Sequence, residues 1–181
     1  MSKIELVNAS CVNQEVDAIV NAANRYLLSG GGICGAIFKS AGYNELTEAC
    51  SKIKTPLNDG DAVITPAFNM PNTKHIIHAV GPNFNNTPEA FKKLQNAYYN
   101  SLIVLKNNNL HSIAFPLISS GIFGGDLEHP AFESAAQCLE AYNKFITENN
   151  DYDISVLLCA FSLKEYEETK GLFEEELKHG K

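Results

Sequence analysis

The sequence contains no long apolar run. None of its apolar stretches approaches the roughly 20 residues that a helix needs to cross a bilayer. Residues 1–10 also lack the basic region and apolar core of a secretory signal. We therefore expect a cytoplasmic protein with no membrane partner.

Positive charge is also scarce. Lysine and arginine number 14 against 21 aspartate and glutamate residues, which gives a formal net charge of -7. Sequence-independent affinity for nucleic acid comes from lysine and arginine side chains that neutralise many phosphates. The composition therefore argues against general nucleic-acid binding.

The spacing patterns of disulfide frameworks, metal sites and common nucleotide sites are missing. The five cysteines are odd in number, with no CxxC pair and no histidine at ligand spacing. Neither a Walker lysine motif nor a GxGxxG spacing is present, so the sequence lacks the usual motifs that predict binding of nucleoside triphosphates or nicotinamide cofactors. We expect no metal and no cofactor. Most of the cysteines should be small buried apolar side chains: Cys11, Cys34, Cys50, Cys138 and Cys159.

The remaining composition is that of one globular α/β domain. The chain has 181 residues, 45% of them apolar and 19% charged, and no repeat or long linker divides it, so we expect a single domain over 1–181. Short apolar runs alternate with longer segments of helical period, which predicts a largely buried sheet between helices. The expected strands are 4–7, 18–20, 62–64, 75–79, 112–115 and 154–159. The expected helices are 34–41, 45–53, 89–107, 131–148 and 163–178.

A triple glycine, residues 30–32, follows the expected strand 18–20. Glycines permit positive φ and close ligand approach, and the helix that opens near Cys34 directs free N–H groups and a partial positive charge outward. Such a corner suits a phosphate, although a flexible connector is the plain alternative. Asn21 and Asn24 weaken that alternative, because they lie at the carboxyl end of the strand, where open α/β sheets place ligand-binding groups.

A second glycine-rich segment, residues 116–126, follows the expected strand 112–115. Backbone N–H groups from Ser120 to Gly124 can form a second anion cradle. Phe123 has no helical or strand partner that explains its apolar side chain. Two interpretations stay open for this ring: it covers a bound sugar, or it fills a core gap beneath the loop.

Five motifs in a fixed order make the sequence resemble the macro domain family. They are 20–24 (VNAAN), 30–33 (GGGI), 35–37 (GAI), 78–82 (HAVGP) and 120–124 (SGIFG), and the resemblance extends over residues 7–177. It implies a three-layer α/β/α domain with a mixed central sheet and a cleft for ADP-ribose. The chain looks most similar to the branch that includes bacterial, cellular and viral de-ADP-ribosylating enzymes.

The resemblance implies a hydrolase. Such an enzyme removes ADP-ribose from mono-ADP-ribosylated proteins or acts on ADP-ribose derivatives, so the expected partners are ADP-ribose and an ADP-ribosylated protein. Two alternatives remain: a reader module that binds ADP-ribose without turnover, and a phosphatase acting on ADP-ribose 1″-phosphate.

The same resemblance assigns roles to individual residues. Asn24 matches the asparagine that contacts the distal ribose and is the expected catalytic residue. The first loop, beside that ribose and the diphosphate, comprises Gly30, Gly31, Gly32 and Ile33. The second loop wraps the diphosphate, with Phe123 against the distal ribose, and comprises Ser119, Ser120, Gly121, Ile122, Phe123 and Gly124. Phe161 matches the aromatic residue that packs on adenine.

The sequence departs from the family pattern near the adenine position. The family usually has Gly-Asp-Ile there, with the aspartate accepting from the adenine amino group, whereas this chain has Ala9, Ser10 and Cys11. Ser10 still accepts a hydrogen bond but lacks the charge that makes such bonds roughly twice as strong. We expect Ser10 and Cys11 to contact the ligand, with Asn8 as the rival occupant if the register slips by two residues.

Cys34 is the second departure, since many cellular hydrolases carry an aspartate at its position. Without that carboxylate a general base is missing, and a ligand phosphate is left to activate water while Asn24 orients the ribose. No histidine is visibly placed to make Cys34 a nucleophile, so burial is the expected role of its thiol. His78, inside the apolar run 76–80, is interpreted as a hydrogen-bonded core histidine and not as a catalyst.

Overall fold

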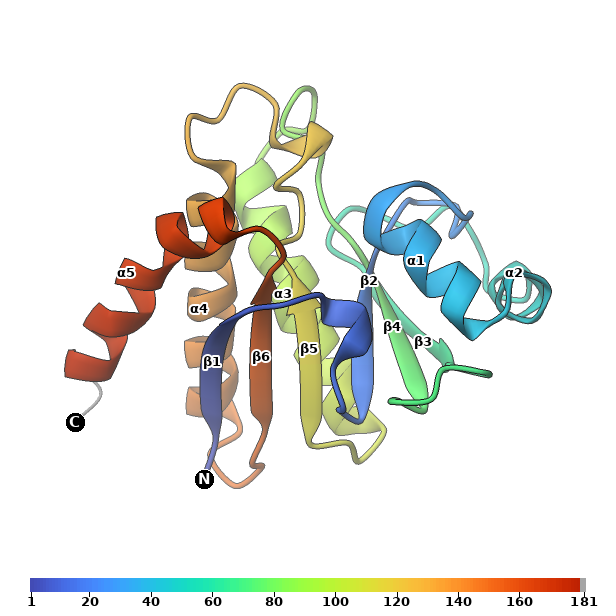
Figure 1. Ribbon diagram of the computed structural model, residues 1–181, viewed down its shortest axis with the longest axis horizontal. Helices are drawn as coiled ribbons and strands as arrows, with labels where there is room; N and C mark the ends of the chain where they lie inside the picture. Colours follow the sequence, from blue (N-terminus) through green and yellow to red (C-terminus); the bar gives the residue numbers. More distant parts are fainter. Residues whose placement is uncertain (180–181) are drawn as a thin grey trace.

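The computed structural model describes residues 1–179 and shows one sheet between two layers of helices (Figure 1). The strands are β1 (Lys3–Asn8), β2 (Ala18–Ala23), β3 (Ala62–Pro66), β4 (His75–Val80), β5 (Ser112–Pro116) and β6 (Ser155–Ala160). The helices are α1 (Gly32–Ala41), α2 (Tyr43–Ser51), α3 (Ala90–Asn107), α4 (Pro130–Glu148) and α5 (Leu163–His179), with short 3-10 turns η1 (Cys11–Asn13) and η2 (Ile122–Gly124). Every expected strand and helix has an observed counterpart, and the three-layer α/β/α class is confirmed.

The sheet is mixed, as expected. Its strand order is β1-β6-β5-β2-β4-β3; the first five strands are parallel, and β3 runs antiparallel to β4. The carboxyl ends of the five parallel strands therefore meet along one edge of the sheet, which we call the carboxyl edge. The amino end of the antiparallel strand β3 lies at the same edge, so the loop before β3 joins the loops that follow the others.

Alternate side chains of the strands fill two separate cores. Val20, Ile77 and Phe115 belong to the core under α3, α4 and α5, whereas Ile19 and Ile76 belong to the core under α1, α2 and η1. A sheet that is covered on both faces needs apolar residues at successive positions. This requirement explains why inner strands such as β4 are buried at successive positions, whereas the edge strand β1 alternates between exposed and partly buried residues.

The start of α5 is fixed by a capping box, the pairing in which two residues three apart satisfy each other's backbone N–H. The Ser162 hydroxyl accepts from the Glu165 N–H at 3.1 Å, and the Ser162 N–H donates to the Glu165 carboxylate at 3.1 Å. Because β6 ends at Ala160, the chain has one residue, Phe161, between the strand and this cap. The cap therefore restricts where Phe161 can lie.

The five cysteines are all buried and unpaired, which confirms their interpretation as small core side chains. Of the helices within the described residues, none is long and apolar enough to span a membrane.

Candidate functional site

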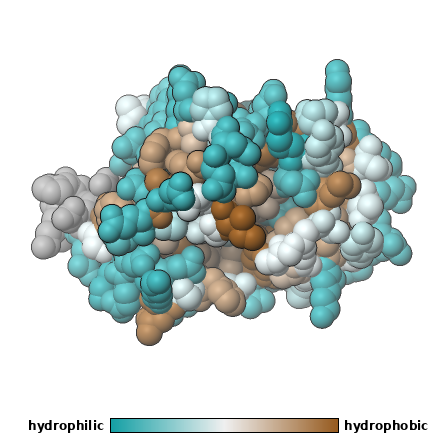
Figure 2. Space-filling view, turned by 90° about the horizontal axis from the view of Figure 1, so that it is seen from above, coloured by the Kyte–Doolittle hydropathy of each residue, from teal (hydrophilic) through white to brown (hydrophobic). Residues whose placement is uncertain are grey.

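The fold brings all the predicted site residues to the carboxyl edge. They lie in the loops after four neighbouring strands and at the start of α1. Figure 2 views the molecule from above, looking onto this edge, and shows apolar side chains gathered near the middle of the face among hydrophilic ones. In sheet order the residues are Ser10 and Cys11 after β1, Phe161 after β6, Ser119, Ser120, Gly121, Ile122, Phe123 and Gly124 after β5, and Asn24, Gly30, Gly31, Gly32 and Ile33 after β2.

The ends of β1 and β6 hold Ser10 and Phe161 side by side. Asn8 pairs with Ala160 across the two strands, and the Ala9 N–H donates to the Ala160 carbonyl at 3.1 Å. Phe161 is 76% exposed, so its ring is free to pack on a planar ligand. The Asn8 amide donates to the Ala160 and Phe161 carbonyls at 3.0 and 3.3 Å, which ties it to β6. These bonds use the donor group of the Asn8 side chain and leave its carbonyl oxygen as an acceptor, so Asn8 remains a rival of Ser10 for a ligand beside Phe161.

Ser10 and Cys11 differ in the direction of their side chains. The Ser10 hydroxyl accepts from the Val12 N–H at 3.3 Å and caps η1 at the surface. The Cys11 thiol is buried and donates to the Ala114 carbonyl at 3.2 Å, inside the core, and burial raises its pKa well above the ordinary value. Of the two predicted ligand contacts, Ser10 can therefore use its side chain, whereas Cys11 can reach a ligand only through its backbone.

Asn24 fastens the loop that follows β2. Its side-chain carbonyl accepts from the Tyr26 and Leu28 N–H groups at 3.1 and 3.0 Å, and its amide donates to the Leu28 carbonyl at 2.7 Å. The carbonyl oxygen uses both lone pairs in these bonds, and one amide hydrogen stays available for a ligand. Asn24 therefore presents a partly exposed amide whose orientation the loop fixes.

Below this loop lies the Cys34 thiol, which is buried and donates to the same Leu28 carbonyl at 3.7 Å. Burial raises the pKa of Cys34, although hydrogen bonds from the Gly30 backbone and the Asn21 side chain oppose the rise. The thiol is thus protonated at neutral pH. It supports the Asn24 loop, which confirms its expected burial.

Unpaired backbone N–H groups are concentrated in the two glycine loops. Gly31 is the N-cap of α1, and Gly32 has φ 57°, a left-handed conformation that a β-branched residue would strain. A Cβ added at any of residues 30–32 would meet nothing within 4 Å, so this loop is open on its outer side. Within the described part of the chain, no hydrogen bond is donated by the N–H groups of Gly30, Gly31, Gly32, Ile33, Ser120, Gly121, Ile122 and Phe123.

Hydrogen bonds to neighbouring backbone groups fix the second glycine loop. The Ser119 and Ser120 hydroxyls donate to the Pro82 and Leu117 carbonyls at 2.7 and 2.8 Å, and the Phe84 N–H donates to the Phe123 carbonyl at 2.8 Å. Both serines therefore act on the loop's shape, while the N–H groups of residues 120–123 donate no hydrogen bond within the described part of the chain. Phe123 is 40% exposed, so it does not fill a core gap, and the ring remains available to a ligand.

A buried polar chain lies under the site. His78 is fully buried, with Nδ1 3.0 Å from the Asn21 amide nitrogen and Nε2 2.9 Å from the Thr65 hydroxyl. The Asn21 amide donates to Nδ1, so the Nε2–H donates to Thr65. Burial lowers the pKa of His78 to about 4. The histidine is therefore a neutral core group, which confirms its interpretation from the sequence.

The structure also shows features that the sequence did not reveal. A polar cavity beyond β2 is lined by side chains from separate segments, among them Arg25, Asp59, Thr87 and Lys93, and no local motif marks it. Among the described residues there is no group of three or more His, Cys, Asp and Glu side chains that could hold a metal ion.

The chain matches the family model described as Macro domain over residues 20–135. It is 37% identical over 179 residues to ADP-ribose glycohydrolase MACROD1 of Rattus norvegicus, covering 98% of this chain but 65% of that protein, which is less than two thirds. It is 37% identical over 150 residues to O-acetyl-ADP-ribose deacetylase of Salmonella typhimurium, covering 81% of this chain and 80% of that protein. The solved Oceanobacillus iheyensis macrodomain with ADP superimposes with a TM-score of 0.85 at 34% identity, covering 98% of this chain and 93% of that one.

Proposed function

Because the chain belongs to the macro domain family, we propose that it binds ADP-ribose at the carboxyl edge and hydrolyses a bond at the distal ribose. The observation that carries the proposal is the pair of glycine loops whose N–H groups at residues 30–33 and 120–123 donate no hydrogen bond within the described residues. These loops lie between an exposed aromatic ring and a fixed asparagine amide. The names of the relatives support it, since both specify enzymes that act on ADP-ribose or its acetyl ester.

The order of the strands predicts how the ligand lies along the carboxyl edge. Adenine packs on Phe161 beside Ser10, the diphosphate crosses the two glycine loops, and the distal ribose meets Asn24 and Phe123. Neutral N–H groups and the positive end of α1 bind the diphosphate. This accounts for an anionic ligand on a protein with a net charge of -7.

The reaction adds water across the bond between the anomeric carbon of the distal ribose and the modified side chain. Water attacks that carbon, the bond to the side chain breaks, and ADP-ribose leaves with the water oxygen while the side chain regains a proton. Asn24 orients the ribose through its amide. The loops 9–11, 24–31 and 161–162 carry no aspartate or glutamate, and in the loop after β5 the nearest carboxylate, Asp126, lies three residues beyond Phe123. We therefore assign the proton of the water to a phosphate oxygen of the ligand.

Two other functions use the same cleft. A reader module binds ADP-ribosylated protein without turnover. This alternative is favoured by Ser10 and Cys34, two uncharged residues at positions where many family members carry an aspartate. A phosphatase of ADP-ribose 1″-phosphate would direct the same water at phosphorus.

The test is to incubate the protein with mono-ADP-ribosylated proteins that carry ester and N-glycosidic linkages, with O-acetyl-ADP-ribose and with ADP-ribose 1″-phosphate. Release of ADP-ribose from at least one modified protein or from the acetyl ester supports the hydrolase. Saturable binding of ADP-ribose without any release makes the chain a reader. Release of inorganic phosphate alone makes it the phosphatase.

A further inference from the structure

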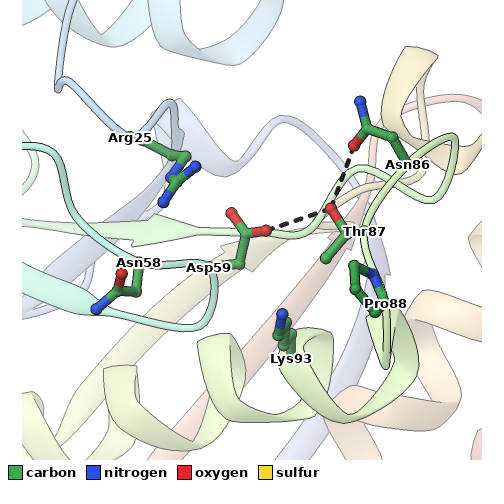
Figure 3. Close-up of a pocket in the computed structure, with 7 residues that line it drawn as sticks. All are labelled: Arg25, Asn58, Asp59, Asn86, Thr87, Pro88 and Lys93. Atoms are coloured by element: carbon green, nitrogen blue, oxygen red, sulfur yellow. Dashed lines mark hydrogen bonds between the residues drawn. The ribbon is translucent and has the colours of Figure 1, made fainter.

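A cavity of about 480 Å³, which we call the second cavity to distinguish it from the proposed ADP-ribose site, lies beside Arg25, the residue that follows Asn24 (Figure 3). Its lining comes from four segments: the loop after β2, the loop before β3, the loop after β4 and the first turn of α3. The lining residues are Arg25, Asn58, Asp59, Asn86, Thr87, Pro88 and Lys93. All of them except Pro88 are polar or charged, unlike the apolar lining that is usual for a small-molecule pocket.

The position of this cavity follows from the strand order β1-β6-β5-β2-β4-β3. Phe161 follows β6 and Asn24 follows β2, so the proposed ligand runs from β6 across β5 to β2. The cavity continues the same line, because its other segments flank β4 and β3 and Arg25 is the residue next to Asn24. It therefore adjoins the end of the cleft where the modified protein is attached to the distal ribose.

The walls of the cavity are held firmly. Arg25 Nε donates to the Leu57 carbonyl at 2.9 Å, and the Leu57 N–H donates to the Arg25 carbonyl at 2.8 Å. Gly60 has φ 97°, and a Cβ there would lie 3.1 Å from the Asn96 Cβ and 3.3 Å from the Lys93 carbonyl oxygen. The loop before β3 thus packs closely on α3, and the cavity is preformed.

The charged groups of the cavity lack charged partners. Neither Arg25 nor Lys93 forms an ion pair in the part of the chain that the structure describes. Asp59 accepts a hydrogen bond from the Thr87 hydroxyl at 3.3 Å, and Figure 3 shows its carboxylate and the Arg25 guanidinium facing the same space. Two carboxylates flank the cavity without lining it: Asp61, which accepts from the Asn58 N–H at 2.8 Å, and Glu89, the N-cap of α3. Within the lining itself two cations face one carboxylate, so the side chains that an anion would meet inside the cavity are more positive than negative.

From this arrangement we infer that the cavity binds an acidic side chain of the substrate protein, close in sequence to the ADP-ribosylated residue. The inference rests on the proposed function. The guanidinium of Arg25 presents a fork that matches a carboxylate, and Lys93 adds a second positive charge. The Asp59 carboxylate can accept hydrogen bonds from the peptide N–H groups of the same substrate segment. A free phosphate ion has no such N–H donor. An aspartate or glutamate within a polypeptide thus satisfies both signs of charge in the cavity.

The test uses two peptides that carry ADP-ribose through a hydrolysis-resistant linkage, so that affinity is measured whether or not the protein turns them over. One peptide has aspartate beside the modified residue and the other has asparagine. Fluorescence anisotropy should give a dissociation constant about fivefold lower for the aspartate peptide, the scale of an ion pair at a partly exposed site. Lys93→Met and Arg25→Met should each reduce this ratio to below two. Lys92→Met, which removes the same charge from an exposed neighbour on α3, should keep it.

Equal affinities of the wild-type protein for the two peptides would overturn the inference, as would retention of the fivefold ratio in both Lys93→Met and Arg25→Met. Lys93 makes no hydrogen bond through its side chain within the described residues, so its variant tests the charge even if Arg25→Met disturbs the loop. Free ADP-ribose is titrated in parallel. If it does not bind, the proposed function fails as well; if it binds while the peptides do not differ, only the assignment of the second cavity fails.

Discussion

The side-chain amide nitrogen of Asn24 lies 2.7 Å from the carbonyl oxygen of Leu28. The same oxygen accepts from the Cys34 thiol at 3.7 Å, so one carbonyl joins the proposed catalytic residue to the first buried turn of α1. Asn24 holds the shape of its loop, and in the proposed function it also orients the ribose. A change at Asn24 should affect both.

Asn24→Asp is the sharpest change at this position. The carboxylate keeps both acceptor contacts with the Tyr26 and Leu28 N–H groups, but it repels the Leu28 carbonyl and cannot donate to the ribose. Leaving such polar groups unpaired costs about 1 to 3 kcal/mol, so calorimetry should show ADP-ribose binding weakened about tenfold or more. Asn44→Asp adds the same charge at an exposed position on α2 and should bind like wild type. Unchanged affinity in Asn24→Asp would remove this residue from the ribose site.

Cys34→Ala should leave turnover almost unaffected. The thiol is buried and protonated, because burial raises its pKa, and it donates to a backbone carbonyl. Release of ADP-ribose from a modified protein should stay within about threefold of wild type, whereas loss of a catalytic nucleophile lowers rates by several orders of magnitude. Iodoacetamide should likewise leave the wild-type rate unchanged. A variant that folds normally but releases no ADP-ribose would make Cys34 a participant in the chemistry.

Ser10→Asp should tighten adenine recognition. The residue caps η1, a position that aspartate fills as well as serine, so the fold should tolerate the change. A carboxylate there restores a charge-assisted bond to the adenine amino group and should tighten ADP-ribose by about 1 kcal/mol, or about fivefold. Inosine diphosphate ribose, which has a carbonyl in place of that amino group, should gain nothing. The same change in affinity for both ligands would show that Ser10 does not face adenine.

His78 should make stability depend on pH in the acid range. Its pKa is lowered to about 4 in the folded protein, from 6.5, so the fold favours the neutral ring and the unfolded chain takes up the proton first. The contribution is complete above pH 6.5 and is lost as the pH falls from 6.5 towards 4. Between pH 7.5 and 5 the loss should be about 2 kcal/mol.

Urea unfolding at these two pH values measures this effect. His78→Gln should lose that part of the pH dependence, while His129→Gln, at an exposed position, should retain it. The neighbours of the ring are the uncharged side chains of Asn21 and Thr65, so no ion pair should mask the result. An identical pH dependence in wild type and His78→Gln would contradict the assignment.

Much of the fold was predictable because its causes are local. Strands such as 75–79 are buried on both faces and therefore read as apolar runs, and the Ser162 cap needs only Glu165 three residues on. The two glycine loops were predictable because each motif is contiguous in the sequence.

The remaining features depend on contacts between distant segments. The direction of the Cys11 thiol is set by its hydrogen bond to the Ala114 carbonyl. The hydrogen bond from the Asn8 amide to the Phe161 carbonyl joins residues 153 positions apart. The cavity between Arg25 and Lys93 exists because β2, β3 and β4 are neighbours in the sheet. Sequence spacing carries no sign of such pairings until the topology is known.

Calorimetric titration with ADP-ribose tests the central claim most directly. The two glycine loops follow the neighbouring strands β2 and β5 at the same edge of the sheet, so we expect a single saturable site with one ligand per chain. The melting temperature should rise with ligand concentration because the ligand binds only the folded state. The absence of both a heat of binding and a melting shift at millimolar ADP-ribose would contradict the account.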